Sequence, residues 1–302
     1  MNLPTPHGDK LRALLQNEKL PNGDRRRIEE AIVRYQSWLE ALRTVPGNDQ
    51  GVRLAVDLLN DYRTFIDLQV VFDSEDDFLY RQKGQLKLDN TVIEEFLPHL
   101  VSRVFPQVSE TFSVGPQSCF AALYFTSTIG TAIASPGAQA RTKDQDFTIS
   151  RRLYLRASFH PEHADAVDRL EANLGYLCAE CKTNLDKTMF QEACATAHDV
   201  KTAVPGAKYL LLCEWLDMTP ISTAGTDVDE VLILRKARRL GSQVRNAFAT
   251  RTGRIAKRAE YASYLAAHPF APDVFERFLS HVRGLLENRD PDEGDALTRG
   301  YF

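Results

Sequence analysis

Apolar residues in the first third of the chain recur at the spacing of helix faces. Between residues 10 and 45 the pattern predicts two helices around a turn at residues 20–23, and Asp24 is the predicted N-cap of the second helix. Thr91 and Glu94 have capping-box spacing, which predicts the start of a later helix. Strand alternation is almost absent here, so we expect a helical region that packs on the rest of the chain.

Further along, the pattern changes to that of strands. Phe147 and Ile149 alternate with polar neighbours, which predicts a strand with one apolar face. A turn at residues 150–152 and a returning strand at residues 153–155 are predicted next. The polar residues 161–174 are then predicted to form a helix, because proline suits a first helical position.

Three continuous apolar runs predict buried strands at residues 177–182, 208–216 and 231–234, with a helix at residues 185–204 after the first run. This order describes a mixed sheet flanked by helices. We therefore predict an α/β (α+β) fold in two parts. Residues 1–110 would form the helical N-terminal region, and residues 111–302 would form the domain that holds the sheet and ends in a basic segment.

The strand predicted at residues 177–182 carries two charges on one side. Alternate residues of a strand point the same way, so Cys178, Glu180 and Lys182 share one face and Leu177, Ala179 and Cys181 share the other. Burying two charges is costly unless something compensates them. A divalent metal with a phosphate is one such compensation, and a Glu–Lys pair on a solvated edge is the plainer alternative.

The composition excludes several classes of protein. Of the 302 residues, 43% are hydrophobic and 26% are charged, as in soluble globular proteins. There is no apolar run long enough to cross a membrane, and the first residues do not resemble a signal peptide. The five cysteines have no regular spacing, so we expect free thiols and a cytoplasmic protein. Cys178 and Cys181 would face opposite sides of the sheet, which argues against a zinc or redox pair.

Positive charge is concentrated near the C-terminus, although the formal net charge is −4. Residues 231–259 contain nine basic residues and no acidic one: Arg235, Lys236, Arg238, Arg239, Arg245, Arg251, Arg254, Lys257 and Arg258. Such a segment suits contacts with phosphate groups. A solvated basic face, or a site for an acidic protein, is the alternative.

Two carboxylates on neighbouring strands suit a magnesium ion. Asp146 lies on one predicted strand and Glu180 on the next, and the carbonyl oxygen of Cys181 could add a further oxygen ligand. Lys182 could contact the phosphate and the attacking water, and so stabilise developing negative charge. Asp144 competes with Asp146 for the ligand role, because both share a strand face. We prefer Asp146, since the apolar strand begins directly after it.

These residues form the D…E-x-K pattern of the PD-(D/E)XK nucleases, and a longer resemblance surrounds it. The segments Lys143–Phe147, Glu180–Lys182, Leu185–Ala193 and Asp229–Arg235 resemble Type II restriction endonucleases of the BbvCI kind, which cut double-stranded DNA at sites related to CCTNAGC. The resemblance is strong over about residues 139–236. It is looser over residues 77–100, with their Leu-Asp-Asn and Glu-Glu-Phe elements. Gln145 stands where the superfamily's name has proline, as in many such enzymes.

The resemblance implies a Mg²⁺-dependent endonuclease that leaves 5′-phosphate ends. Asp146 and Glu180 would be metal ligands and Lys182 the catalytic lysine. Glu192 is added as an accessory catalytic residue, because the BbvCI-like pattern has an acid there; a solvated helix face is the alternative.

Partners follow from the same resemblance. Seven residues of the basic segment, from Arg235 to Arg254, are predicted to contact DNA phosphates. Cutting both strands needs two active sites or two turnovers, so we expect a homodimer or a heterodimer with a related subunit. The helical N-terminal region could bind DNA, dimerise or only pack on the core. A repair or structure-specific nuclease and a non-cutting DNA-binding subunit remain alternatives, and the intact Asp146, Glu180 and Lys182 argue against the latter.

Overall fold

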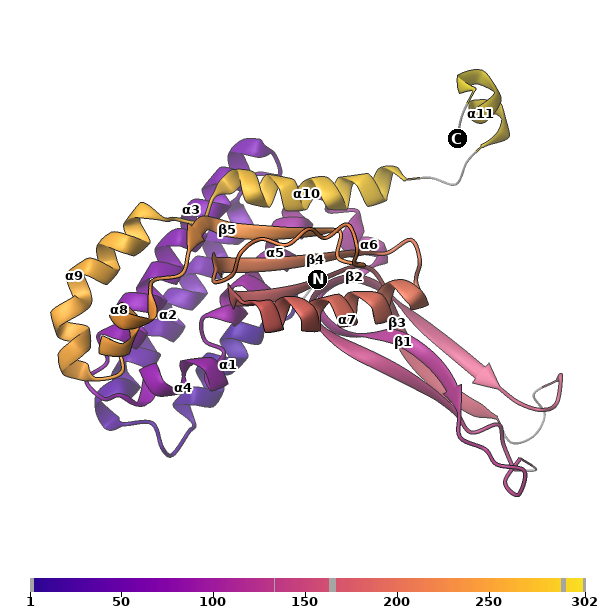
Figure 1. Cartoon of the computed structure of the whole chain (residues 1–302), viewed down its shortest axis with the longest axis horizontal. Coiled ribbons are helices and arrows are strands. Elements are labelled where there is room, and N and C mark those ends of the chain that lie inside the picture. The colour runs from indigo at the N-terminus through magenta and orange to yellow at the C-terminus, as the bar shows by residue number, and fades with distance from the viewer. Residues whose placement is uncertain (1–2, 133, 163–166, 289–291, 301–302) are drawn as a thin grey trace.

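A five-stranded mixed sheet forms the centre of the computed structural model, which describes residues 3–132, 134–162, 167–288 and 292–300 (Figure 1). The strands are β1 Ser113–Phe125, β2 Ala138–Ala157, β3 Asp168–Leu185, β4 Lys208–Leu216 and β5 Glu230–Arg238, in the order β1-β2-β3-β4-β5. Pairs β1–β2 and β2–β3 are antiparallel, and pairs β3–β4 and β4–β5 are parallel. The predicted α/β class with a mixed sheet is confirmed.

Helices precede and follow the sheet. Before it lie α1 Pro6–Leu15, α2 Asn22–Thr44, α3 Asp49–Phe65, the π-helix η1 Ile66–Phe72, α4 Phe78–Leu86, α5 Asn90–Val104 and α6 Val108–Thr111. Helix α7 Lys187–Ala203 connects β3 to β4, and after β5 come α8 Ser242–Ala247, α9 Arg251–Ala267, α10 Pro272–Glu287 and α11 Glu293–Arg299. Among the described residues, no helix combines the length and the apolar character that a membrane crossing requires.

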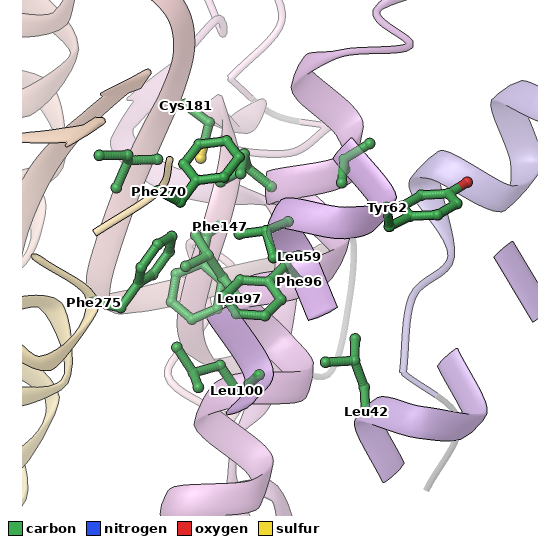
Figure 2. Close-up of a cluster of buried hydrophobic side chains, with 14 of the residues drawn as sticks. Leu42, Leu59, Tyr62, Phe96, Leu97, Leu100, Phe147, Cys181, Phe270 and Phe275 are labelled. Atoms are coloured by element: carbon green, nitrogen blue, oxygen red, sulfur yellow. The ribbon is translucent and has the colours of Figure 1, made fainter. Parts of the chain in front are cut away.

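The two faces of β3 bury different side chains, as the alternation predicted. Leu177, Ala179 and Cys181 belong to a large apolar cluster with residues of α2, α3, α5 and α10. Cys178 faces α7 and belongs to a smaller cluster. Figure 2 shows part of the large cluster, where side chains of α5 meet Phe147 of β2 and Phe275 of α10. The N-terminal helices therefore pack on one face of the sheet as expected.

Both predicted helix caps were wrong. Helix α2 already begins at Asn22, and the fully buried Asp24 accepts hydrogen bonds from the Ser74 hydroxyl at 2.8 and 2.9 Å. Helix α5 is capped by Asp89, while the Thr91 hydroxyl donates to the Lys87 carbonyl. Asp24 thus bonds a residue of a distant segment, whereas Thr91 bonds one turn back to Lys87 and across the fold to His7.

The strands are longer than their apolar pattern indicates. β2 runs through the predicted turn at residues 150–152 with only a register shift at Ile149/Ser150, so the turn and the separate returning strand were wrong. Residues 168–174 belong to β3 instead of the predicted helix, of which residues 163–166 lie outside the described part. This end of β2 and β3 projects beyond the helices (Figure 1). Apolar residues 170, 172 and 174 alternate with polar residues 169, 171 and 173, which is a strand period. The helix prediction gave more weight to the proline at position 161 than to this alternation.

A buried ion network joins the helical region to the sheet. Arg63 of α3 donates to both oxygens of Glu214 of β4, at 3.0 to 3.3 Å, and forms an ion pair with Asp67 of η1. Arg235 of β5 donates to Glu214 at 3.3 Å. Because removal of one partner leaves an uncompensated buried charge, such a network costs about 3–5 kcal/mol when broken.

His99 of α5 is a buried imidazole whose Nε2 has no hydrogen-bond partner among the described residues. Burial, assisted by the charge of Arg43, lowers the pKa of His99 to about 4. The folded protein therefore holds this ring neutral, while the unfolded chain protonates it near pH 6.5.

This difference predicts a pH-dependent stability. Since the folded-state pKa is depressed, His99 weakens the fold as the pH falls from about 6.5 to 4, by about 1.4 kcal/mol per pH unit. A His99→Leu variant should lose less stability across this window than the wild type, as measured by urea unfolding at a series of pH values. His160→Leu, at an exposed site, is the control. Parallel pH profiles for wild type and His99→Leu would contradict the assignment.

Candidate active site

The predicted site residues meet where β2 leaves β3. The β2–β3 ladder reaches Phe147↔Ala179, after which β2 continues paired with β1 only. β3 runs on beside β4 as far as Leu185. From residue 180 onward, one edge of β3 is therefore without a strand neighbour. A strand edge inside a protein still needs partners for its N–H and C=O groups.

Side chains satisfy the backbone of Cys181 at this edge. Its N–H donates to Oδ2 of Asp146 at 2.9 Å, and its carbonyl accepts from Nδ2 of Asn90 at 2.8 Å. Asp146 is thus held against β3 even though its own strand has turned away. The Cys181 carbonyl faces the same edge, where its second lone pair remains open to a further ligand.

Glu180 and Lys182 lie together, as their shared strand face predicted. Lys182 Nζ is 2.5 Å from Glu180 Oε1, and the Tyr209 hydroxyl donates to Glu180 Oε2 at 3.3 Å. Burial acts to lower the pKa of Lys182, but the hydrogen bond and charge of Glu180, together with the charge of Asp146, outweigh it and raise that pKa. The lysine is therefore a fixed positive charge at neutral pH.

Helix α5 adds two residues that the sequence did not assign to the site. Nδ2 of Asn90 donates to Oε1 of Glu94 at 2.9 Å as well as to Cys181. Burial, followed by the charge of Asp146, raises the pKa of Glu94 to about 7. The Leu-Asp-Asn and Glu-Glu-Phe elements that resemble the restriction enzymes contain both residues. The sequence did not link Asn90 and Glu94 to the site, because both are far from Asp146 along the chain.

The donors fit a cation that keeps water and phosphate oxygens among its ligands. Asp146 and Glu180 are the two carboxylates beside Cys181, and burial raises the pKa of Asp146 against the effect of its Cys181 hydrogen bond. Oδ1 of Asn90 is buried without a hydrogen-bond partner in the described part of the chain. In those same residues no group of three or more His, Cys, Asp or Glu side chains is arranged as a metal cage. Mg²⁺ does not require one, because one or two carboxylates with water and phosphate usually hold it.

Three neighbouring residues lie apart from this group. Asp144 is exposed and accepts a hydrogen bond from Ser118 of β1, so the structure brings Asp146, not Asp144, to Cys181. Glu192 is exposed on α7; its charge contributes to the raised pKa of Lys182, although no direct contact joins them. Gln145 is buried, and its amide atoms have no partner among the described residues.

The residues of the basic segment have different environments. Arg235 and Arg254 are buried: Arg235 donates to Glu214 and to the His268 carbonyl, and Arg254 donates to four backbone carbonyls and pairs with Asp77. A phosphate contact by either residue would require these bonds to break.

The other predicted DNA contacts are more accessible. Lys236 and Arg239 pair with Asp273 and Asp217. Arg245 is half-buried and donates from Nε to the Leu240 carbonyl. Arg238 and Arg251 are exposed, without an ion pair to any described residue. Counting charge in the sequence could not separate the structural arginines from the accessible ones.

Comparisons with known proteins identify a family and a fold. The family model described as Bpu10I restriction endonuclease matches residues 85–302. Among solved structures, the chain is similar to the native BbvCI A2B2 tetramer at low resolution, with a TM-score of 0.54 and 20% sequence identity over 86% of this chain and 96% of that chain. At that identity the likeness is one of fold. No curated protein sequence matches the chain.

Asn90 provides a test of the site's construction. Asn90→Ala should lower the free energy of unfolding by about 1–3 kcal/mol, because it removes the partner of the Cys181 carbonyl and of Glu94. Urea unfolding measures the change. Asn184→Ala is the matched control, since among the described residues the one hydrogen-bond partner of Asn184 Nδ2 is the Met189 sulfur, at 3.8 Å. Equal stability of Asn90→Ala and the wild type would show that neither bond matters.

Proposed function

The chain belongs to the Bpu10I restriction endonuclease family, and we propose that it is a sequence-specific, Mg²⁺-dependent endonuclease for double-stranded DNA. It would act as a Type II restriction enzyme or as one subunit of such an enzyme. Family membership makes it a nuclease that acts on DNA. The observation that carries the finer proposal is the meeting of Asp146, Glu180 and Lys182 at the free edge of β3.

Each of these residues has a distinct part in phosphodiester hydrolysis. Asp146, Glu180 and the Cys181 carbonyl would hold Mg²⁺, with Glu94 beside them. Bound there, the ion would supply positive charge to the phosphate and make water more acidic. Glu180 orients the Lys182 ammonium, which can donate to a phosphate oxygen and stabilise the charge that builds up during attack.

The reaction itself is an in-line displacement. The oxygen of a water molecule bonds to phosphorus while the bond from phosphorus to the 3′ oxygen breaks. The leaving oxygen takes up a proton, and the products are a 5′-phosphate and a 3′-hydroxyl. Arg238, Arg251 and Arg245 can contact neighbouring phosphates without losing an internal ion pair, which positions the duplex but does not read its sequence.

Cutting both strands calls for a second active site or a second turnover. The structure similar to this chain is an A2B2 tetramer. We propose that this chain likewise assembles with a second copy or with a related subunit. The assembled protein would then place one active site on each of the two antiparallel DNA strands.

Plasmid cleavage tests the activity. With Mg²⁺ the purified protein should give discrete fragments, or discrete nicks, at one short site. Lys182→Ala and Glu180→Ala should cut at least about 10²–10³-fold more slowly, since each loses a group that acts on the transition state. Both should still bind the site in Ca²⁺ by gel shift, and Lys19→Ala, at an exposed position, should match the wild type. Random or structure-dependent cuts would indicate a repair nuclease, and a protein that binds DNA without cutting would be a non-catalytic subunit.

Thermal unfolding tests the metal site without reference to activity. A cation that binds only the folded state stabilises it by RT ln(1 + [L]/Kd), about 2.7 kcal/mol at a hundredfold excess over Kd. Mg²⁺ and Ca²⁺ should therefore raise the Tm of the wild type, and Asp146→Asn and Glu180→Gln should reduce the rise. Asp144→Asn is the control, because Asp144 lies apart from the group. The same rise in all four proteins would place the cation elsewhere.

A further inference from the structure

The outer parts of β2 and β3 form a ribbon of two antiparallel strands that projects beyond the helices (Figure 1). In this β2–β3 ribbon, residues 151–157 pair with residues 168–174, while the ladder between β1 and β2 ends at Ser150. The ribbon continues from the pair Phe147↔Ala179, next to the candidate active site. Arg156 follows Phe147 by nine residues, which span up to about 30 Å at roughly 3.3 Å per residue. The ribbon thus extends from the site by nearly one turn of B-DNA, about 34 Å.

One face of the ribbon carries long side chains in solvent. The register places Arg152 opposite Asn173, Tyr154 opposite Glu171 and Arg156 opposite Arg169, and residues opposite each other on paired strands share a face. All of these except Asn173 are exposed, and Tyr154 is 69% exposed. The other face is largely apolar and is half-buried or buried at Leu153, Leu155, Leu170, Ala172 and Leu174.

The charges on the exposed face do not balance one another. Arg152 forms an ion pair with Glu171 at 3.5 Å. Arg156 and Arg169 lie directly opposite each other, and neither forms an ion pair within the part of the chain that the structure describes. Like charges directly opposite on paired strands are destabilising. Because this arginine pair does not stabilise the ribbon, it indicates a site for an anion outside the protein.

We infer that the exposed face of the β2–β3 ribbon binds phosphate groups of the DNA that flanks the cleavage site, up to about one helical turn from the cut bond. Arg156 and Arg169 would contact neighbouring phosphates, and the Tyr154 hydroxyl can donate to a third. Two guanidinium groups side by side match the repeated charge of a DNA strand. DNA fits better than an acidic protein, because the ribbon starts beside the candidate active site, where the duplex has to lie. The inference rests on the proposed endonuclease function.

The length of the flanking DNA tests this contact on the full-length protein. Two duplexes contain the cleavage site: one extends about 15 base pairs on each side of the cut, and the other about 6, or about 20 Å, which ends before it reaches Arg156. Their Kd values are measured in Ca²⁺ by gel shift. The wild type should bind the long duplex roughly tenfold more tightly, which corresponds to about 1.4 kcal/mol.

Removal of the arginine pair gives a second readout. In the double variant Arg156→Ala/Arg169→Ala, the preference for the long duplex should disappear, while binding of the short duplex stays at the wild-type level. On the long duplex, the slope of log K against log salt should become shallower by about 2, since each lost phosphate contact removes about 1.

Arg151→Ala is the matched control for this variant. Arg151 is an exposed arginine of the same ribbon, but it lies on the other face, so its variant should keep both the preference and the salt slope of the wild type. All variants should keep the wild-type Tm, because these three arginines form no ion pair with any described residue. A change in DNA binding is then not a consequence of unfolding.

The outcomes separate this inference from the function on which it rests. If the wild type binds and cuts DNA without preferring the long duplex, or if the double variant keeps the preference, the inference is wrong and the endonuclease proposal stands. The arginine pair would then be left to an acidic protein partner. If the double variant loses the preference for one flanking sequence only, the ribbon reads bases instead of phosphates, which also overturns the inference. If no duplex is bound or cut, the proposed function fails and the inference fails with it.

Discussion

The separation of β2 from β3 is the constraint on which the site depends. Backbone groups at a protected strand edge must be paired, and beyond Ala179 β3 no longer has β2 to pair them. Asp146 and Asn90 take over that task at Cys181. A carboxylate is thereby fixed beside Glu180 by an ordinary requirement of strand pairing. The separation of the two strands is thus what brings the two carboxylates of the site together.

The opening also explains why the N-terminal helices belong to the site. Asn90 and Glu94 can reach β3 only if α5 lies in one place and at one rotation. Glu95, the next residue on α5, accepts hydrogen bonds from the backbone N–H groups of His7 and Gly8 and from the Tyr35 hydroxyl. From the other side, the Arg63–Glu214–Arg235 network joins α3 to the sheet. Two buried polar networks therefore hold the helical region in register with β3.

Local sequence rules predicted the parts that depend on local physics. The apolar runs predicted β4 and residues 177–182 of β3, and strand alternation placed Glu180 and Lys182 together. Strand alternation could not find Asn90 and Glu94. Both lie on a helix that packs close to β3 in space but is far from it along the chain. The start of β3 was missed although residues 169–174 alternate between polar and apolar, because the proline at position 161 favoured a helix. Arg235 and Arg254 show the remaining limit: a basic residue counts the same in a sequence whether it meets solvent or fills a core.

The position of His7 has a practical consequence for anyone who produces this protein. Its ring is fully buried and bonded to Thr91 and Tyr62, at 3.1 and 2.8 Å, so the start of α1 is an internal part of the fold. A start codon chosen a few residues downstream, or a purification tag joined there without a spacer, would disturb α5 and through it the hydrogen bond from Asn90 to Cys181 of β3. A preparation made in this way would lose the arrangement around Cys181 although Asp146, Glu180 and Lys182 are intact.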